Sequence, residues 1–130
     1  MKDKDFFQRL INISDAFFGS INEIQSEVTP DFSKLCIHIM NVLIDQSLSQ
    51  TSFCTTKVAL KTSQVSDDQI KFLICLADNA SKELSISSYS YDEAKNLLQD
   101  VIGFFDSLGN FSASIDCHEN DCYAAIYMRV

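Results

Sequence analysis

The stretch Ser90–Gly109, SYDEAKNLLQDVIGFFDSLG, carries the clearest local signal in the chain. Ser90 followed three residues later by Glu93 is the pattern of a capping box, in which each side chain bonds to the backbone N–H of the other residue. Gly109 is predicted to end the helix as its C-terminal cap. Apolar residues recur between these ends at helical spacing: Ala94, Leu97, Leu98, Val101, Phe105 and Leu108. The stretch therefore predicts an amphipathic helix that must bury one face against another layer.

The residues that follow this helix predict a hairpin. Apolar residues alternate from Phe111 to Cys117, a turn is expected over His118–Asp121, and a second strand is expected over Cys122–Val130. The short connection makes this pair of strands antiparallel.

Two further strand patterns precede the helix. Thr56, Val58 and Leu60 share one side of the first, and residues 70–76 alternate in the same way after a turn over residues 66–68. The run Leu84–Ser88 is either another short strand or a loop.

Two helical segments come before the strands, and Pro30 marks the boundary between them. Thr29 can cap the second helix with Pro30 in its first position, and we end this helix near Ser49. The first segment, residues 1–27, has a broad apolar face, and Gly19 could bend or split it. We predict that it forms a homodimer; the alternative is that it folds back and completes the core. Light scattering that shows a monomer at micromolar concentration would contradict the dimer.

The order of these elements predicts an α+β fold, a two-layer sandwich with an additional N-terminal helix. We expect a mostly antiparallel or mixed sheet of about four or five strands. The strand over Ile70–Leu76 should be central, and the last strand should pair with Phe111–Cys117. The helices over Asp31–Ser49 and Asp92–Leu108 should cover one face, because each alternating strand has one apolar side to bury.

Composition and charge exclude several classes of protein. The chain of 130 residues is 46% apolar, which excludes a disordered protein. Its net charge of −8, with Lys and Arg scattered singly, argues against nucleic acid and suits a basic protein partner. The apolar runs are too short to cross a bilayer, and the start lacks the apolar core of a signal peptide. We therefore expect a cytoplasmic protein that does not bind membranes.

The five cysteines are predicted to be free thiols, because the count is odd and no signal peptide is visible. Cys36 and Cys75 lie in apolar runs and are expected in the core. Cys117, His118 and Cys122 fall short of a structural zinc signature, so no metal is expected. Unpaired thiols are the prediction for Cys117 and Cys122, although a cross-strand disulfide is geometrically allowed.

The segment Val28–Leu35, VTPDFSKL, and the helix that continues from it resemble the ATP-binding domain of sensor histidine kinases, in the GHKL superfamily. That family commonly reads Val, two residues, Asp, two residues, Arg, Leu, and then an apolar helix with two asparagines four apart. Lys34 replaces the arginine here, Asn41 matches the first asparagine, and Asp45 falls on the second.

A second point of resemblance is Ala77–Ala80, ADNA, which follows a strand pattern. The family has Asp-x-Gly there, and its aspartate binds the adenine amino group, which implies this role for Asp78. Ala80 replaces the glycine. The closing helix and hairpin also resemble the way such domains end. The resemblance therefore covers residues 28–130 and implies a histidine-kinase ATPase-like domain over that range.

The resemblance implies only a vestigial nucleotide site, formed by Asn41, Asp45 and Asp78. The glycine boxes that give phosphates backbone amides in the family are missing, so no bound cofactor is expected. The alternative is that these three residues are ordinary polar positions. We expect His38 to be packed or partly buried among apolar neighbours rather than to act in phosphotransfer. No catalytic set of residues is recognisable.

The sequence therefore predicts a non-catalytic protein-interaction module of two-component-type signalling. It would be a pseudo-ATPase domain that binds a response regulator or a kinase. The alternatives are a histidine phosphotransferase-like protein, an active ATP-binding kinase domain, and an unrelated small α+β adaptor or immunity-type protein. A nucleotide titration separates the active kinase from the others.

Overall fold

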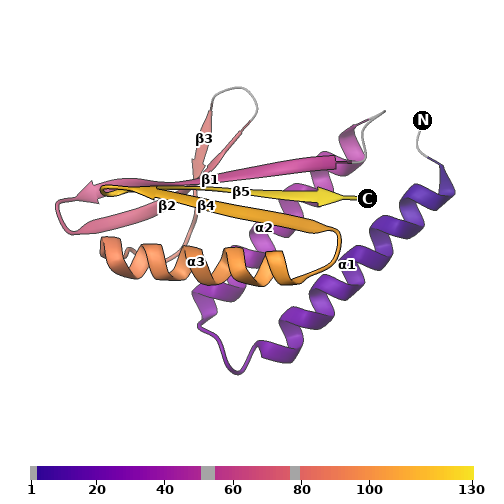
Figure 1. Ribbon diagram of the computed structural model, residues 1–130, viewed down its shortest axis with the longest axis horizontal. Helices are drawn as coiled ribbons and strands as arrows, with labels where there is room; N and C mark the ends of the chain where they lie inside the picture. The colour runs from indigo at the N-terminus through magenta and orange to yellow at the C-terminus, as the bar shows by residue number, and fades with distance from the viewer. Residues whose placement is uncertain (1–2, 51–54, 77–79) are drawn as a thin grey trace.

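The computed structural model describes residues 3–50, 55–76 and 80–130, and these contain three helices and five strands (Figure 1). The elements in chain order are α1 (Lys4–Ile24), α2 (Pro30–Ser49), β1 (Thr55–Ser66), β2 (Gln69–Cys75), β3 (Ser81–Glu83), α3 (Tyr91–Ser107), β4 (Phe111–His118) and β5 (Asp121–Arg129).

The described strands form one sheet in the order β3-β2-β1-β5-β4, and every neighbouring pair is antiparallel. The pairing of the last strand with β4 is confirmed. The expectation that the strand over Ile70–Leu76 is central is wrong, because β1 occupies the centre. β1 is 12 residues long. Residues 55–61 of β1 pair with β5 along one edge, and residues 59–66 pair with β2 along the other. Residues 84–88 form no strand, and β3 lies just before them.

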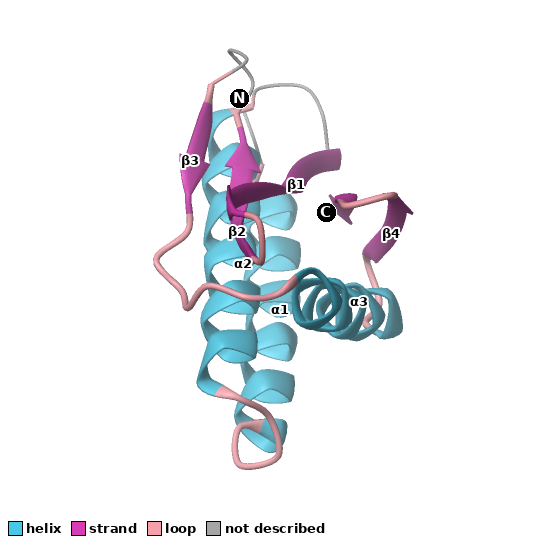
Figure 2. Ribbon diagram, turned by 90° about the vertical axis from the view of Figure 1, so that its left-hand side faces the viewer, coloured by secondary structure: helices cyan, strands magenta, loops and turns pink. Residues whose placement is uncertain are grey.

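α2 and α3 cover the same face of the sheet, as the sequence predicts (Figure 2). The strand residues that alternate toward this face are buried, among them Leu60, Phe72 and Ile126. Side chains of a strand point alternately to its two faces, and no helix of the described ranges lies on the opposite face of the sheet. The α+β class with helices on one face is thus confirmed. None of the helices in the described ranges combines the length and hydropathy that a membrane crossing requires.

α1 runs without a break through Gly19, and one of its faces joins the same core as α2, α3 and the sheet. Phe17 stacks on Phe105 of α3 with ring centroids 5.5 Å apart. The first segment therefore folds back and completes the core. Its buried residues recur every three or four positions: Phe6, Leu10, Ile13, Phe17 and Ile21. Self-association through α1 stays a prediction, for which Phe7 and Ile11 are the large exposed apolar residues of the helix.

The helix ends follow the local sequence in part. Thr29 caps α2 by accepting a hydrogen bond from the backbone N–H of Phe32 at 3.2 Å. The capping box at the start of α3 is present. The expectation that Gly109 caps the end of α3 is wrong, because Asn110 is the residue in the left-handed conformation, with φ of 71°. Asparagine tolerates this conformation because its short polar side chain can hydrogen-bond locally.

Cys117 and Cys122 form a disulfide, so the prediction of free thiols is wrong for this pair. The two residues lie directly opposite each other on β4 and β5, with Cα atoms 4.1 Å apart. Antiparallel pairing brings such residues within reach of each other, whatever the total number of cysteines. Cys36 is buried as expected, whereas Cys75 is half-buried on the outer face of β2 rather than in the core. Cys54 lies outside the described residues.

Candidate functional site

The structure places two of the three residues expected in a vestigial nucleotide site. Asn41 and Asp45 lie one turn apart on the exposed side of α2. Asn41 lines a small hollow of about 270 Å³ together with Lys34 and His38, and Asp45 is not among the described residues around it. Asp78 lies outside the described residues, so the structure does not bring the three together.

His38 is exposed, and the expectation that it is packed or partly buried is wrong. The buried stripe of α2 runs through Leu35, Ile39 and Leu43. At 3.6 residues per turn, position 38 lies about 100° around the helix axis from the middle of that stripe. The apolar neighbours of His38 in the sequence therefore do not surround it in space.

The start of α3 already holds a carboxylate of its own. The side chain of Ser90 accepts a hydrogen bond from the backbone N–H of Glu93 at 3.3 Å and donates one to the Glu93 carboxylate at 2.8 Å. The hydrogen bonds that the Ser90 hydroxyl and backbone N–H donate to the carboxylate lower the pKa of Glu93. Asp92 adds a second negative charge in the same turn, so this helix end suits cations better than phosphates. Within the described ranges, no cluster of three or more His, Cys, Asp or Glu residues is placed to hold a metal ion.

The outer face of the sheet is the most distinctive surface of the molecule. Its central row crosses the sheet through Cys75, Ala59 and Ala125, which the strand register places side by side. Ala59 and Ala125 are only 7% and 8% exposed although no helix covers them, because larger neighbours flank them. Those neighbours are Tyr123 and Tyr127, which lie on either side of Ala125 along β5.

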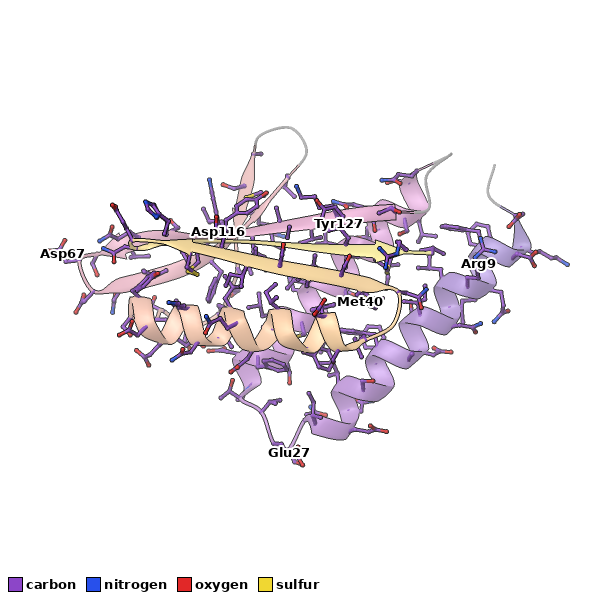
Figure 3. All side chains as sticks on the ribbon, viewed as in Figure 1. Arg9, Glu27, Met40, Asp67, Asp116 and Tyr127 are labelled. Carbon is purple, nitrogen blue, oxygen red and sulfur yellow. A yellow bond between two sulfur atoms is a disulfide. The ribbon has the colours of Figure 1, made fainter. Side chains whose placement is uncertain are left out.

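Ala59 and Cys75 of this row line a hollow of about 580 Å³ together with the two tyrosines. Tyr123 and Tyr127 are both exposed, at 46% and 38%, and Tyr127 lies on the side of the sheet away from the helices (Figure 3). The hollow continues past Cys75 toward the end of α2, where Gln46 and Gln50 also line it. This face is thus a trough with an apolar floor and aromatic walls.

On the strands of this face, basic residues slightly outnumber acidic ones, in contrast to the protein as a whole. Lys57 pairs with Tyr127 across the strands and lies over its ring, 5.8 Å from the centroid, and Lys61 pairs with Tyr123. The Nζ atom of Lys71 forms an ion pair with Glu83 at 2.7 Å. Four of the ten basic residues, Lys57, Lys61, Lys71 and Arg129, alternate onto this face. Glu83, Asp116 and Asp121 lie on the same face, but Lys57 is the one charged side chain among the described residues that line the hollow, so the trough itself carries positive charge.

Sequence reasoning missed this surface. The alternation of Lys57, Ala59 and Lys61 on the second side of a strand is visible in the chain, as is the spacing of Tyr123 and Tyr127. The side-by-side arrangement of β1 and β5, which assembles these residues into one trough, depends on strand order. Comparison of the chain with protein-family models, curated proteins and solved structures gave no match.

Proposed function

We propose that this protein is a non-catalytic protein-interaction module that binds its partner across the outer face of the sheet. The observation that carries the proposal is the trough floored by Ala59 and Cys75 and walled by Tyr123 and Tyr127. Uncovered faces of antiparallel sheets are usually polar, whereas this one offers apolar area and two aromatic side chains. Tyrosines are enriched in protein interfaces because they bury much area at little conformational cost.

The dimensions and charge of the trough favour an acidic helix as the bound segment. Tyr123 and Tyr127 are four residues apart on β5, which separates them by about 13 Å. A helix with its side chains is about 10–12 Å wide, so one helix can contact both tyrosine rings at once. Lys57 and Lys61 stand beside these walls and would pair with carboxylates on the flanks of such a helix.

The narrower proposal is that the partner is a response regulator or a kinase of a two-component-type system. Its support is the sequence resemblance of residues 28–130 to histidine-kinase ATPase domains. The cytoplasmic setting belongs to the same proposal. In a reducing compartment, we expect Cys117 and Cys122 to be isolated from cells as thiols. The exposure of His38 keeps a histidine phosphotransferase-like function as the alternative, tested by formation of phosphohistidine at that residue.

The test of the proposal is affinity capture with the tagged protein in its native host, followed by binding measurements with the purified partner. Ala59→Phe fills the floor of the trough and should abolish binding. Ser63→Phe adds the same side chain on the outer face of β1, outside the hollow, and should leave binding intact. A partner that binds both variants equally well would contradict the proposal. A captured protein of another class would refute only the two-component part.

Nucleotide binding separates this function from an active kinase. We expect no useful binding of ATP with magnesium by isothermal titration, since phosphates need backbone amides or basic groups that the start of α3 does not offer. Binding tighter than about 100 μM that Asp78→Ala abolishes would assign the protein to the active kinases.

A further inference from the structure

A second hollow lies on the helical layer, on the opposite side of the molecule from the trough. It has a volume of about 720 Å³ and is bounded by α3 on one side and by the end of α1 and the start of α2 on the other. We name it the helical groove. The turn between α1 and α2, with Glu27 near its tip, projects past α3 and forms one wall (Figure 3).

The helical groove is long and has an apolar floor. Its lining on α3 runs from Glu93 to Phe104, about three turns or 16 Å of helix. Leu97 and Phe104 of α3 and Phe32 of α2 supply apolar surface to it. An apolar floor of this length matches the helix-in-groove mode of recognition, in which anchors at i, i+3 or i+4, and i+7 extend over about 10 Å.

The two walls of the groove contact each other directly in the free protein. The hydroxyl of Tyr89, just before α3, donates a hydrogen bond to Asp31 in the first turn of α2. The rings of Phe32 and Phe104 meet edge to face with centroids 5.8 Å apart. The groove is therefore formed before any partner arrives, which lowers the cost of binding.

The rim of the groove is acidic. Glu27, Glu93 and Asp100 are exposed around it, and none of its described lining residues is basic. Three carboxylates around one apolar floor favour a cationic ligand and disfavour an acidic one. This charge is the reverse of that in the trough on the sheet, so the two surfaces select partners of opposite charge.

Gly103 leaves open space on the side of α3 that lines the groove. It lies inside α3, four residues before the helix ends, where glycine costs about 1 kcal/mol of helix stability relative to alanine. No described atom lies within 4 Å of a Cβ built at this position, so packing inside the protein does not require a glycine. Gly103 lines the groove, and the missing side chain lets another backbone come near the helix.

We propose that the helical groove binds a basic amphipathic helix of a partner protein. The apolar face of that helix lies on Leu97 and Phe104 and passes over Gly103. Its Lys or Arg residues meet Glu27, Glu93 and Asp100 at the rim. This inference is independent of the proposed sheet-face partner. With both surfaces in use, the protein would connect an acidic segment to a basic one.

The test uses the full protein and a synthetic amphipathic peptide of Leu and Lys, about 14 residues long, the length of an average helix. The control peptide has Glu in place of every Lys. We expect saturable binding of the Leu/Lys peptide, weakened by salt, with NMR shifts concentrated in residues of the groove. The Leu/Glu peptide should not bind there. Failure of the Leu/Lys peptide to bind the wild-type protein would overturn the proposal.

Matched variants locate the binding. The double variant Glu27→Gln and Asp100→Asn should lower the affinity for the Leu/Lys peptide roughly tenfold. Asp106→Asn removes a charge from α3 outside the groove and should change little. Gly103→Ala should raise Tm by about 4 °C yet lower the affinity for the peptide. A purely structural role of Gly103 would not change stability and affinity in opposite directions. Gly103→Leu should abolish binding in a folded protein.

Two outcomes would overturn the assignment to a basic helix. The first is unchanged peptide affinity in Gly103→Leu, which would place the peptide elsewhere. The second is self-association of the wild-type protein that Gly103→Leu abolishes, which would make a second copy of this chain the occupant.

Discussion

At the scale of the residue, the start of α3 is the most completely specified point of the chain. Ser90 and Glu93 stand at capping-box spacing, and their side chains satisfy each other's backbone N–H groups in the structure. This arrangement needs only four consecutive residues, so it can be predicted without knowledge of the rest of the fold. It also gives Glu93 a pKa below its ordinary value, because Ser90 donates to the carboxylate.

Ser90→Ala should therefore lower the free energy of unfolding by about 1 kcal/mol, measured by urea denaturation. Ser88→Ala is the control, since Ser88 is exposed and precedes the cap. Because the pKa of Glu93 is depressed in the folded state, the charged carboxylate stabilises the fold above the unfolded pKa. This stabilisation disappears as pH falls through the folded pKa. The difference in the free energy of unfolding between wild type and Ser90→Ala should thus become smaller in acid. An NMR titration in which Glu93 has the same pKa in both proteins would contradict this account.

At the scale of the element, the β4–β5 hairpin is closed covalently near its turn. Reduction of Cys117–Cys122, which encloses a short loop, should lower the free energy of unfolding by about 2 kcal/mol. The sheet should persist, because β5 also pairs with β1 from Tyr123 to Arg129. The measurement compares urea denaturation with and without reductant.

The control for this prediction is the double variant Cys117→Ser and Cys122→Ser, which should no longer respond to reductant. Equal responses of wild type and double variant would show that the disulfide does not stabilise the protein. Alkylation of the folded protein followed by peptide mapping shows which cysteines are free thiols. Cys36 should react only after unfolding, since burial raises the pKa of its thiol and shields it.

At the scale of the whole molecule, α1, α2, α3 and the sheet share one core. Phe17 lies at the point where the helices meet, and it contacts the rings of Phe104 and Phe105. Phe17→Ala should cost about 3–5 kcal/mol, because it leaves a cavity among these rings. Phe7→Ala removes the same ring from a site that is 43% exposed and should cost far less.

The transition should also be cooperative, with far- and near-ultraviolet circular dichroism changing together. Separate loss of α1 before the remainder of the protein would show that the first helix is only appended to the core. Equal destabilisation by Phe7→Ala and Phe17→Ala would contradict the burial pattern of α1.

Of the candidate sites, the chain alone pointed to Asn41, Asp45 and Asp78, and the trough and the helical groove were not predicted. Residues 38, 41 and 45 are close in sequence, so their shared exposure on α2 follows from helical geometry once the buried stripe is known. The trough needs β5 beside β1, and the groove needs the α1–α2 turn beside α3. Neither arrangement is encoded in a short stretch of residues.

Local patterns in the sequence by themselves determined the helices α2 and α3, the final hairpin, the capping box and the α+β class. These features depend on hydrogen bonds and periodicities within a few residues. Tertiary structure alone decided that β1 is central, that α1 joins the core, that Cys117 bonds to Cys122 and that His38 is exposed. Each of these outcomes depends on which surfaces meet in the folded chain, and contacts between residues far apart in sequence make that choice.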